Sequence, residues 1–205
     1  MEGSLIMDNK NFESDLPLGY KEDKHINAKN LSFGIIMNLI ALVILILVVF
    51  IACLFIPTFD NIDKLLAENI WLYYLVLFGG MFGYIILHEL VHGIAYKAMT
   101  KEKLTFGFSW SCAYCGVPNI YTYRKTAIIA LVAPLITFTI ILITLMLVFF
   151  KIDVIIYLIL SLIFGLHLGG CSGDIYGFLL FMFKYRDPKT LMRDTGPEQF
   201  FYVKE

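Results

Sequence analysis

The chain has 205 residues, of which 59% are hydrophobic and 16% are charged, and its formal net charge is −1. Such an apolar composition excludes an ordinary soluble domain and is typical of a protein with several membrane spans. No run of Lys and Arg forms a basic stripe, so the sequence indicates no nucleic-acid partner. Membrane lipids and other membrane segments are the partners that the composition favours.

The chain begins with a polar, charge-mixed segment that lacks the pattern of a cleavable signal peptide. Four apolar stretches follow, and each is long enough to cross a bilayer, which takes roughly 20 residues. We expect the first of them to be a retained anchor. The predicted segments are the polar N-terminal segment (1–32), the spans (33–56, 70–99, 126–150 and 154–183) and the C-terminal tail (184–205).

These segments predict an all-α polytopic membrane protein with about four transmembrane helices in one domain over residues 33–183. Within the loop 101–125, residues 103–110 and 117–123 alternate large apolar with small or polar side chains, as half-buried strands do. We therefore expect a short β-hairpin at the membrane interface, with its turn at Cys115-Gly116. A simple connector is the alternative. The tail over 184–205 contains Asp194-Thr-Gly-Pro and is expected to form turns, with Asp194 serving the fold or assembly.

The basic residues predict the topology of the spans. Four lie in the N-terminal segment, four in the loop 101–125 and five from Lys184 onward, whereas the other two loops contain only Lys64 and Lys151. Cytoplasmic loops of membrane proteins carry an excess of Lys and Arg. We therefore expect a multi-pass protein of the cell membrane with both termini in the cytoplasm.

Of the 17 acidic residues, only Glu89 and Asp174 lie well inside apolar spans. Each costs about 2.5–3.5 kcal/mol there on insertion scales, so such residues usually mark a functional site. Both lie roughly 14 Å in from the cytoplasmic boundary, at 1.5 Å per helical residue. Polar groups at the same depth on different helices are expected to meet.

The sequence His88-Glu89-Leu90-Val91-His92 has the spacing of a zinc site on a helix. Residues four apart share one face, so His88 and His92 can bind one Zn²⁺, and Glu89 can accept a proton from the reacting water. A catalytic zinc needs a third protein ligand and an open position, and Asp174 is the best candidate. A pair of buried histidines without metal is the alternative interpretation.

His167 lies two helical turns before Asp174, in a stretch from 167 to 177 that contains four glycines. Three roles stay open for it: hydrogen bonding to a metal ligand, a place in the core, or ligation. We favour the first two. Cys112 and Cys115 have the spacing of a redox or zinc pair, but no further ligands are nearby in sequence, so two free thiols are expected.

The motif His88-Glu-Leu-Val-His-Gly93 on an apolar helix resembles that of the site-2 protease family of intramembrane zinc metalloproteases. That resemblance implies an Asp on a later span as third ligand, which maps onto Asp174, and strands after the motif helix. Residues 70–200 are more similar to a bacterial family of small membrane proteins, the putative zincin peptidases. The shared features are the motif, an aromatic loop with Pro, Ala133-Pro134 and Gly173-Asp174-Ile175. In site-2 proteases Asn and Pro come before the Asp, whereas Ser172 and Gly173 precede it here.

The resemblance implies hydrolysis of a peptide bond within or near a membrane segment, with a transmembrane or membrane-proximal polypeptide as substrate. Zinc hydrolysis itself is inferred from the residues. Two alternatives stay open: a non-catalytic membrane protein for metal binding or transport, and a zinc hydrolase of a lipid or another non-peptide substrate. No sequence feature indicates an oligomeric state.

Overall fold

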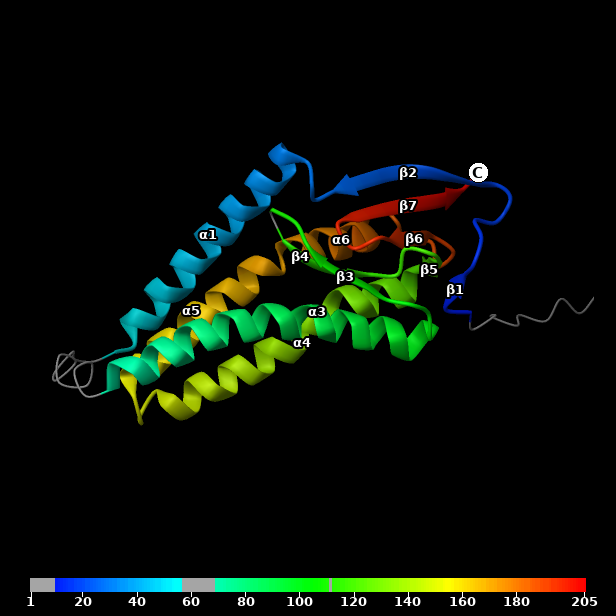
Figure 1. Cartoon of the computed structure of the whole chain (residues 1–205). Coiled ribbons are helices and arrows are strands. Elements are labelled where there is room, and N and C mark those ends of the chain that lie inside the picture. Colours follow the sequence, from blue (N-terminus) through cyan, green and yellow to red (C-terminus); the bar gives the residue numbers. More distant parts are fainter. Residues whose placement is uncertain (1–9, 57–68, 111) are drawn as a thin grey trace, which may run out of the picture.

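The computed structural model describes residues 10–56, 69–110 and 112–205. Its helical elements are α1 (Leu31–Leu54), the π-helical turn η1 (Leu75–Gly79), α3 (Gly80–Thr100), α4 (Arg124–Phe149), α5 (Val154–Gly170) and α6 (Ser172–Phe183). Its strands are β1 (Phe12–Glu13), β2 (Tyr20–Asn27), β3 (Thr105–Phe108), β4 (Ala113–Gly116), β5 (Tyr121–Tyr123), β6 (Leu191–Asp194) and β7 (Glu198–Lys204). Figure 1 shows β1, β2, β5, β6 and β7 gathered at one end of the helices.

Three helices are long and apolar enough to cross a membrane: α1, the helix from Asn69 to Thr100 that contains η1 and α3, and α4. Helices α5 and α6 meet the same criteria together, although the chain bends by 42° between them. The bend lies at Cys171, directly after Gly169 and Gly170, where the lack of side chains weakens a helix. The four predicted spans are therefore found as helices, and the fourth is broken.

The outer surface of these helices carries many large apolar side chains. Helix α1 buries only Gly34 and Ala52, while most of its large aliphatic side chains are exposed. A helix that is hydrophobic all round belongs in a core or in a membrane. These exposed side chains support contact with lipid.

Two glycines of α5 allow α1 to approach closely. A Cβ at Gly169 would lie only 2.8 Å from the backbone oxygen of Ala41, and one at Gly165 only 3.0 Å from the Cα of Leu45. Small residues four apart permit such close packing between helices in membranes. Helix α1 is therefore held against α5 rather than against α3.

A five-stranded antiparallel sheet joins the N-terminal segment, the loop after α3 and the C-terminal tail, in the order β1-β5-β6-β7-β2. The all-α prediction was therefore incomplete, and the expectation of turns in residues 184–205 was wrong. The turn-forming residues of that tail, Asp194 to Pro197, only connect β6 to β7. The sheet packs on α4 and α6 through a buried apolar cluster that includes Ile26, Phe181, Met192 and Phe201.

The predicted hairpin exists, but with a different second strand. Strand β3 pairs with β4, and Phe108 faces Ala113 across a turn in which Ser109 N–H donates to Cys112 O at 2.8 Å. Residues 121–123, which the sequence pattern assigned to the hairpin, form β5 and pair with β1 and β6 instead. The hairpin therefore turns earlier than predicted, and its apolar side chains Phe106, Phe108 and Trp110 are exposed.

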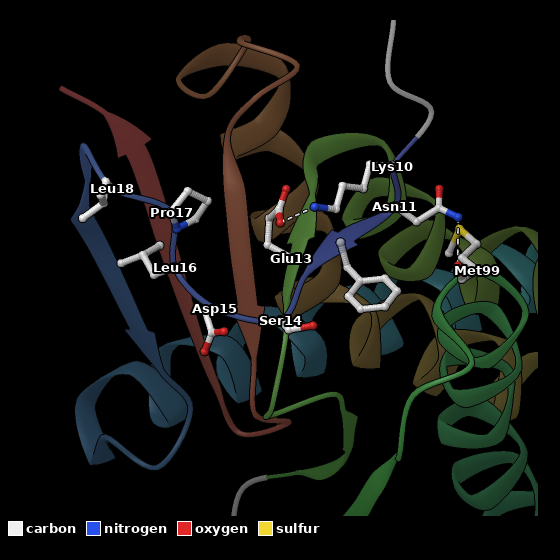
Figure 2. A pocket seen from close by; sticks show the side chains of 10 residues that line it. Lys10, Asn11, Glu13, Ser14, Asp15, Leu16, Pro17, Leu18 and Met99 are labelled. Carbon is white, nitrogen blue, oxygen red and sulfur yellow. Dashed lines mark hydrogen bonds and ion pairs between the residues drawn. The ribbon is translucent and has the colours of Figure 1, made fainter.

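The first residues of the described chain also support α3. Asn11 donates from Nδ2 to the carbonyl of Met99 at 2.8 Å, which satisfies one acceptor at the C-terminal end of that helix. Figure 2 shows this contact beside an open surface pocket along residues 10–18. This pocket lies apart from the polar residues of the spans.

Candidate metal centre

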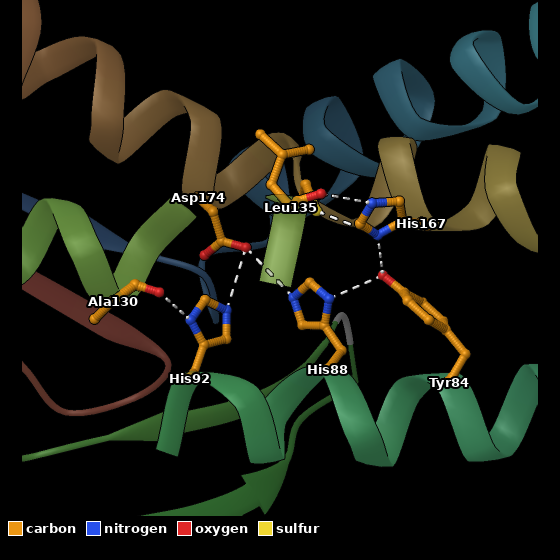
Figure 3. Close-up of polar contacts among 8 residues, drawn as sticks. Tyr84, His88, His92, Ala130, Leu135, His167 and Asp174 are labelled. Atoms are coloured by element: carbon orange, nitrogen blue, oxygen red, sulfur yellow. Dashed lines mark hydrogen bonds and ion pairs between the residues drawn. The ribbon is translucent and has the colours of Figure 1, made fainter. Parts of the chain in front are cut away.

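Helix α3 carries His88 and His92 one turn apart on its inner face. Both side chains are buried, and their ring centroids lie 5.0 Å apart. Asp174 lies in the first turn of α6, just after the bend. Its Oδ2 is 3.4 Å from Nε2 of His88 and 3.4 Å from Nε2 of His92 (Figure 3). The structure thus brings the three predicted ligands together.

The geometry of these three donors fits zinc. Their ligand atoms all lie within 4.8 Å of one another. Two ligands on a tetrahedral Zn²⁺ with bonds of about 2.0–2.1 Å are about 3.3 Å apart, close to the two His–Asp distances. Two imidazoles and one carboxylate also form one of the donor sets that catalytic zinc uses. The residues present therefore suit this metal, with one position left for water or substrate.

His92 is oriented by a carbonyl that a proline leaves free. Pro134 lies inside α4 and has no N–H, so the Ala130 carbonyl four residues earlier receives no helical hydrogen bond from it. Nδ1 of His92 lies 2.8 Å from that carbonyl oxygen. Because a carbonyl only accepts, Nδ1 carries the proton, and the lone pair of Nε2 points toward Asp174.

His88 is oriented through Tyr84, which lies one turn earlier on the same helix. The Tyr84 hydroxyl is 2.9 Å from Nδ1 of His88 and 3.1 Å from Nδ1 of His167. Nε2 of His167 lies 3.3 Å from the Leu135 carbonyl and 3.0 Å from Oγ1 of Thr139 (Figure 3).

The directions of these hydrogen bonds follow from the acceptors. The Leu135 carbonyl only accepts, so a neutral His167 carries its proton on Nε2 and accepts at Nδ1. The Tyr84 O–H then donates to His167 and its oxygen accepts from the Nδ1–H of His88. His88 is left with a free Nε2 lone pair facing Asp174, as a metal ligand requires.

Glu89 lines the same cavity as the three predicted ligands, together with Ala113, Tyr114 and Cys115 of β4. The hairpin reaches α3 at Gly93, where a Cβ would lie 2.8 Å from the ring of Phe106. The glycine that follows the motif therefore lets β3 pack closely on α3. This contact places β4 beside Glu89.

The cavity has a volume of about 510 Å³ and is lined mainly by α1, α3, β4, the α5–α6 junction and the β6–β7 turn. The predicted metal ligands and the predicted base come from α3 and α6. The apolar wall comes from α1 and includes Met37, Ala41, Leu42 and Leu45. Such a mixture, apolar with few convergent polar groups, is typical of a substrate-binding site.

The β6–β7 turn is a part of the site that the sequence did not predict. Buried Asp194 accepts from the Tyr96 hydroxyl at 2.7 Å and from the Gly196 N–H at 2.8 Å, and its backbone carbonyl accepts from Val117 N–H. A Cβ on Gly116 would lie 2.3 Å from the backbone nitrogen of Gly196. The turn thus supports β4 from behind, which agrees with a role for Asp194 in the fold.

Tyr84 was also missed, although its place one helical turn before His88 was a usable signal. Cys112 and Cys115 are free cysteines, and burial raises the pKa of the Cys115 thiol to about 12. A thiol with such a pKa stays protonated and unreactive at neutral pH.

Comparison with known proteins identifies one family. The profile of the family described as "Putative zincin peptidase" matches residues 81–188, which include His88, Glu89, His92 and Asp174. The chain belongs to the putative zincin peptidase family. No curated protein and no solved structure matches the chain. The likeness to site-2 proteases stays a prediction.

Proposed function

We propose that this zincin-family protein is a membrane-embedded zinc metalloprotease that hydrolyses a peptide bond within or near a membrane segment. The observation that carries the proposal is the meeting of His88, His92 and Asp174 beside Glu89, in a cavity between helices long enough to span a membrane. Membership in the zincin family supports a metallopeptidase. Without a metal, these polar groups would be expensive at this depth.

In this proposal, His88, His92 and Asp174 hold the zinc, each through an atom that already faces the other two. Bound zinc lowers the pKa of a coordinated water to about 7 and polarises a carbonyl oxygen. The protein residues set the geometry around it: the Ala130 carbonyl fixes the ring of His92, and Tyr84 fixes that of His88, with His167 supporting Tyr84 by a hydrogen bond.

Glu89 acts as the general base and later as the acid. Its carboxylate accepts a proton from the attacking water and then donates it to the departing amine. Glu89 lines the cavity together with the predicted ligands and with Cys115 of β4. The hairpin thus forms the part of the cavity wall beside the base.

The substrate, a transmembrane or membrane-proximal polypeptide, enters the cavity between α1 and α3. Met37 and Leu42 of α1 and Met81 and Ile85 of α3 line it. The exposed aromatic side chains of β3 and its turn, Phe106, Phe108 and Trp110, lie at the membrane interface, where aromatic rings are enriched. Lipid contacts the outer faces of the helices.

The substitution Glu89→Gln tests the activity. We expect it to abolish turnover while zinc remains bound, because the amide cannot accept the proton but does not disturb the predicted ligands. The measurement compares membrane peptides of cells that express the wild type or Glu89→Gln, in which an uncleaved substrate should accumulate. An unchanged peptide profile would instead favour metal binding or transport, or a non-peptide substrate.

His92→Ala serves as the matched control for the metal. It should lower the zinc content of the purified protein by about one ion per chain, because the centre loses one of three ligands. Zinc retained in this variant would contradict the proposed centre.

A further inference from the structure

A second group of metal-binding side chains lies on the other side of the His88 ring. It comprises Tyr84 and His88 from α3, and His167 and Cys171 from the end of α5. His167 and Cys171 are fully buried, and the four side chains converge on the Nδ1 side of the His88 ring, whereas Asp174 lies on its Nε2 side. Both nitrogens of His88 are therefore directed at donor clusters, Nε2 at Asp174 and Nδ1 at this inner group.

The distances of the inner group are those of ligands around one ion. Atoms of His88, His167 and Cys171 lie within 4.8 Å of one another. Sγ of Cys171 is 3.7 Å from Nδ1 of His167, and a tetrahedral metal with bonds of about 2.3 Å to sulfur and 2.0 Å to nitrogen separates these atoms by about 3.5 Å. The Tyr84 oxygen, 2.9 Å and 3.1 Å from the two Nδ1 atoms, completes a set of four donors.

The chemistry of this group differs from that of the centre at Asp174. Sulfur and imidazole donors favour soft cations such as Cu⁺ and Cd²⁺, whereas a carboxylate is a harder ligand. An ion can reach the group from the cavity, because Tyr84, His88 and Gly170 line the cavity wall at this point.

We propose that Tyr84, His88, His167 and Cys171 form a second, inner metal site for a thiophilic cation, which competes with the centre at Asp174 for the His88 ring. Binding there displaces the thiol proton of Cys171 into the cavity water, since a thiol must be deprotonated to bind a metal. The proton of His88 moves from Nδ1 to Nε2, where the Asp174 carboxylate can accept it, so Nε2 no longer offers a lone pair to the other centre. The His88–Tyr84 hydrogen bond is then lost. The competition rests on the proposed function, but the inner site does not.

Cadmium titration of the full-length protein in detergent tests the site. In a variant with Cys53, Cys112 and Cys115 replaced by Ser, Cys171 is the one remaining thiol of the chain. Adding Cd²⁺ should produce a thiolate-to-cadmium charge-transfer absorbance that saturates at one ion per Cys171. Replacing Cys171 by Ser in the same background should abolish it, and the two proteins should elute alike on size exclusion.

Two further variants separate this site from the proposed function. His92→Ala and Glu89→Gln should both keep the absorbance, because neither residue belongs to the inner group, whereas Tyr84→Phe and His167→Ala should weaken it. In the wild type, the same absorbance should be reduced by Cys171→Ser. Absence of the band in both the single-thiol protein and the wild type would overturn the proposal and leave the inner group as a hydrogen-bonded network only. A band that persists after Cys171→Ser in the single-thiol background would overturn it as well.

Discussion

The two histidines of α3 are held in the same tautomer by different acceptors. A free backbone carbonyl, that of Ala130, fixes His92, whereas the hydroxyl of Tyr84 fixes His88. A side-chain acceptor can be removed by substitution without changing the fold. His88 is therefore the ligand whose orientation is easier to test.

Tyr84→Phe should lower the affinity for zinc by about 10–100-fold, the range seen when a hydrogen-bond partner of a metal ligand is removed. The ring still packs, but Nδ1 of His88 loses its acceptor and the imidazole can rotate. Competition with a chelator measures the affinity. Tyr74→Phe, at an exposed position on the same helix, is the control and should bind zinc like the wild type. Equal affinity in both variants would contradict the orienting role of Tyr84.

Most of the residues at the site could be predicted from the sequence because charge is rare inside apolar spans. Glu89 and Asp174 stood out for that reason, and the helical spacing of His88 and His92 supplied the rest. Tyr84 did not stand out, since tyrosine is common in spans and near their ends. Its role depends on His167, and a contact between α3 and α5 cannot be read from either segment alone.

Helix α4 contributes to the site through one missing donor. Pro134 removes the N–H that would otherwise occupy the Ala130 carbonyl, so that the carbonyl can accept from His92. An internal proline usually costs a helix about 3 kcal/mol. In α4 the proline that carries this cost also leaves free the carbonyl that orients His92, one of the proposed zinc ligands.

Pro134→Ala should stabilise α4 but weaken zinc binding. The new N–H competes with His92 for the Ala130 carbonyl, so Nδ1 of His92 is held less firmly and the affinity should fall, by up to about tenfold. Zinc affinity and thermal unfolding of the metal-free protein are the two measurements. Ile136→Ala, an exposed position on the same helix, controls for a general effect on α4. A variant that loses stability and keeps its zinc affinity would refute this account.

The helices were predictable and the large sheet was not, for physical reasons. Each span has its own apolar composition, which marks it locally. Strand β2 reads Tyr-Lys-Glu-Asp-Lys-His-Ile-Asn, without an apolar face, and β1 has only two residues. They pair with β7 and β5, which follow one or more of the spans in the sequence. The pattern within a single segment carries no information about such distant partners.

At the scale of the whole molecule, stability should depend on the protonation of Asp194. Burial raises the pKa of this carboxyl from 3.8 to about 6. The folded protein therefore binds the proton more tightly than the unfolded chain does. The stabilisation is complete below pH 3.8 and is lost as the pH rises through about 6.

The substitution Asp194→Asn removes the titrating carboxyl, so this contribution to the pH dependence of stability is lost. The melting temperature of the variant, relative to the wild type, should rise between pH 4 and pH 7, because only the wild type must bury a charge at the higher pH. Thermal unfolding at both values measures the difference. Asp15→Asn, at an exposed position, should show no such change. A relative melting temperature that falls with pH would show that the charged form is the better stabilised one.

The sheet also bears on topology, since it unites the N-terminal segment, residues 121–123 and the tail on one side. We propose that this side is cytoplasmic, as the distribution of Lys and Arg indicates. A cysteine at Glu205 should be labelled only after the inner face of the membrane becomes accessible, whereas one at Lys151 should be labelled from outside the cell. The reverse pattern would overturn the orientation.

The edge position of β2 has a consequence for biosynthesis. In the described structure, the one strand that pairs with β2 is β7, yet β2 precedes every span in the chain and β7 follows them all. During translation β2 must therefore wait until all the helices have been inserted. The β6–β7 turn, which lines the cavity, is made late as well. If the chain is the membrane hydrolase proposed above, a nascent chain with its motif helix already in the bilayer still lacks one wall of its cavity, so activity should appear only after membrane insertion is complete.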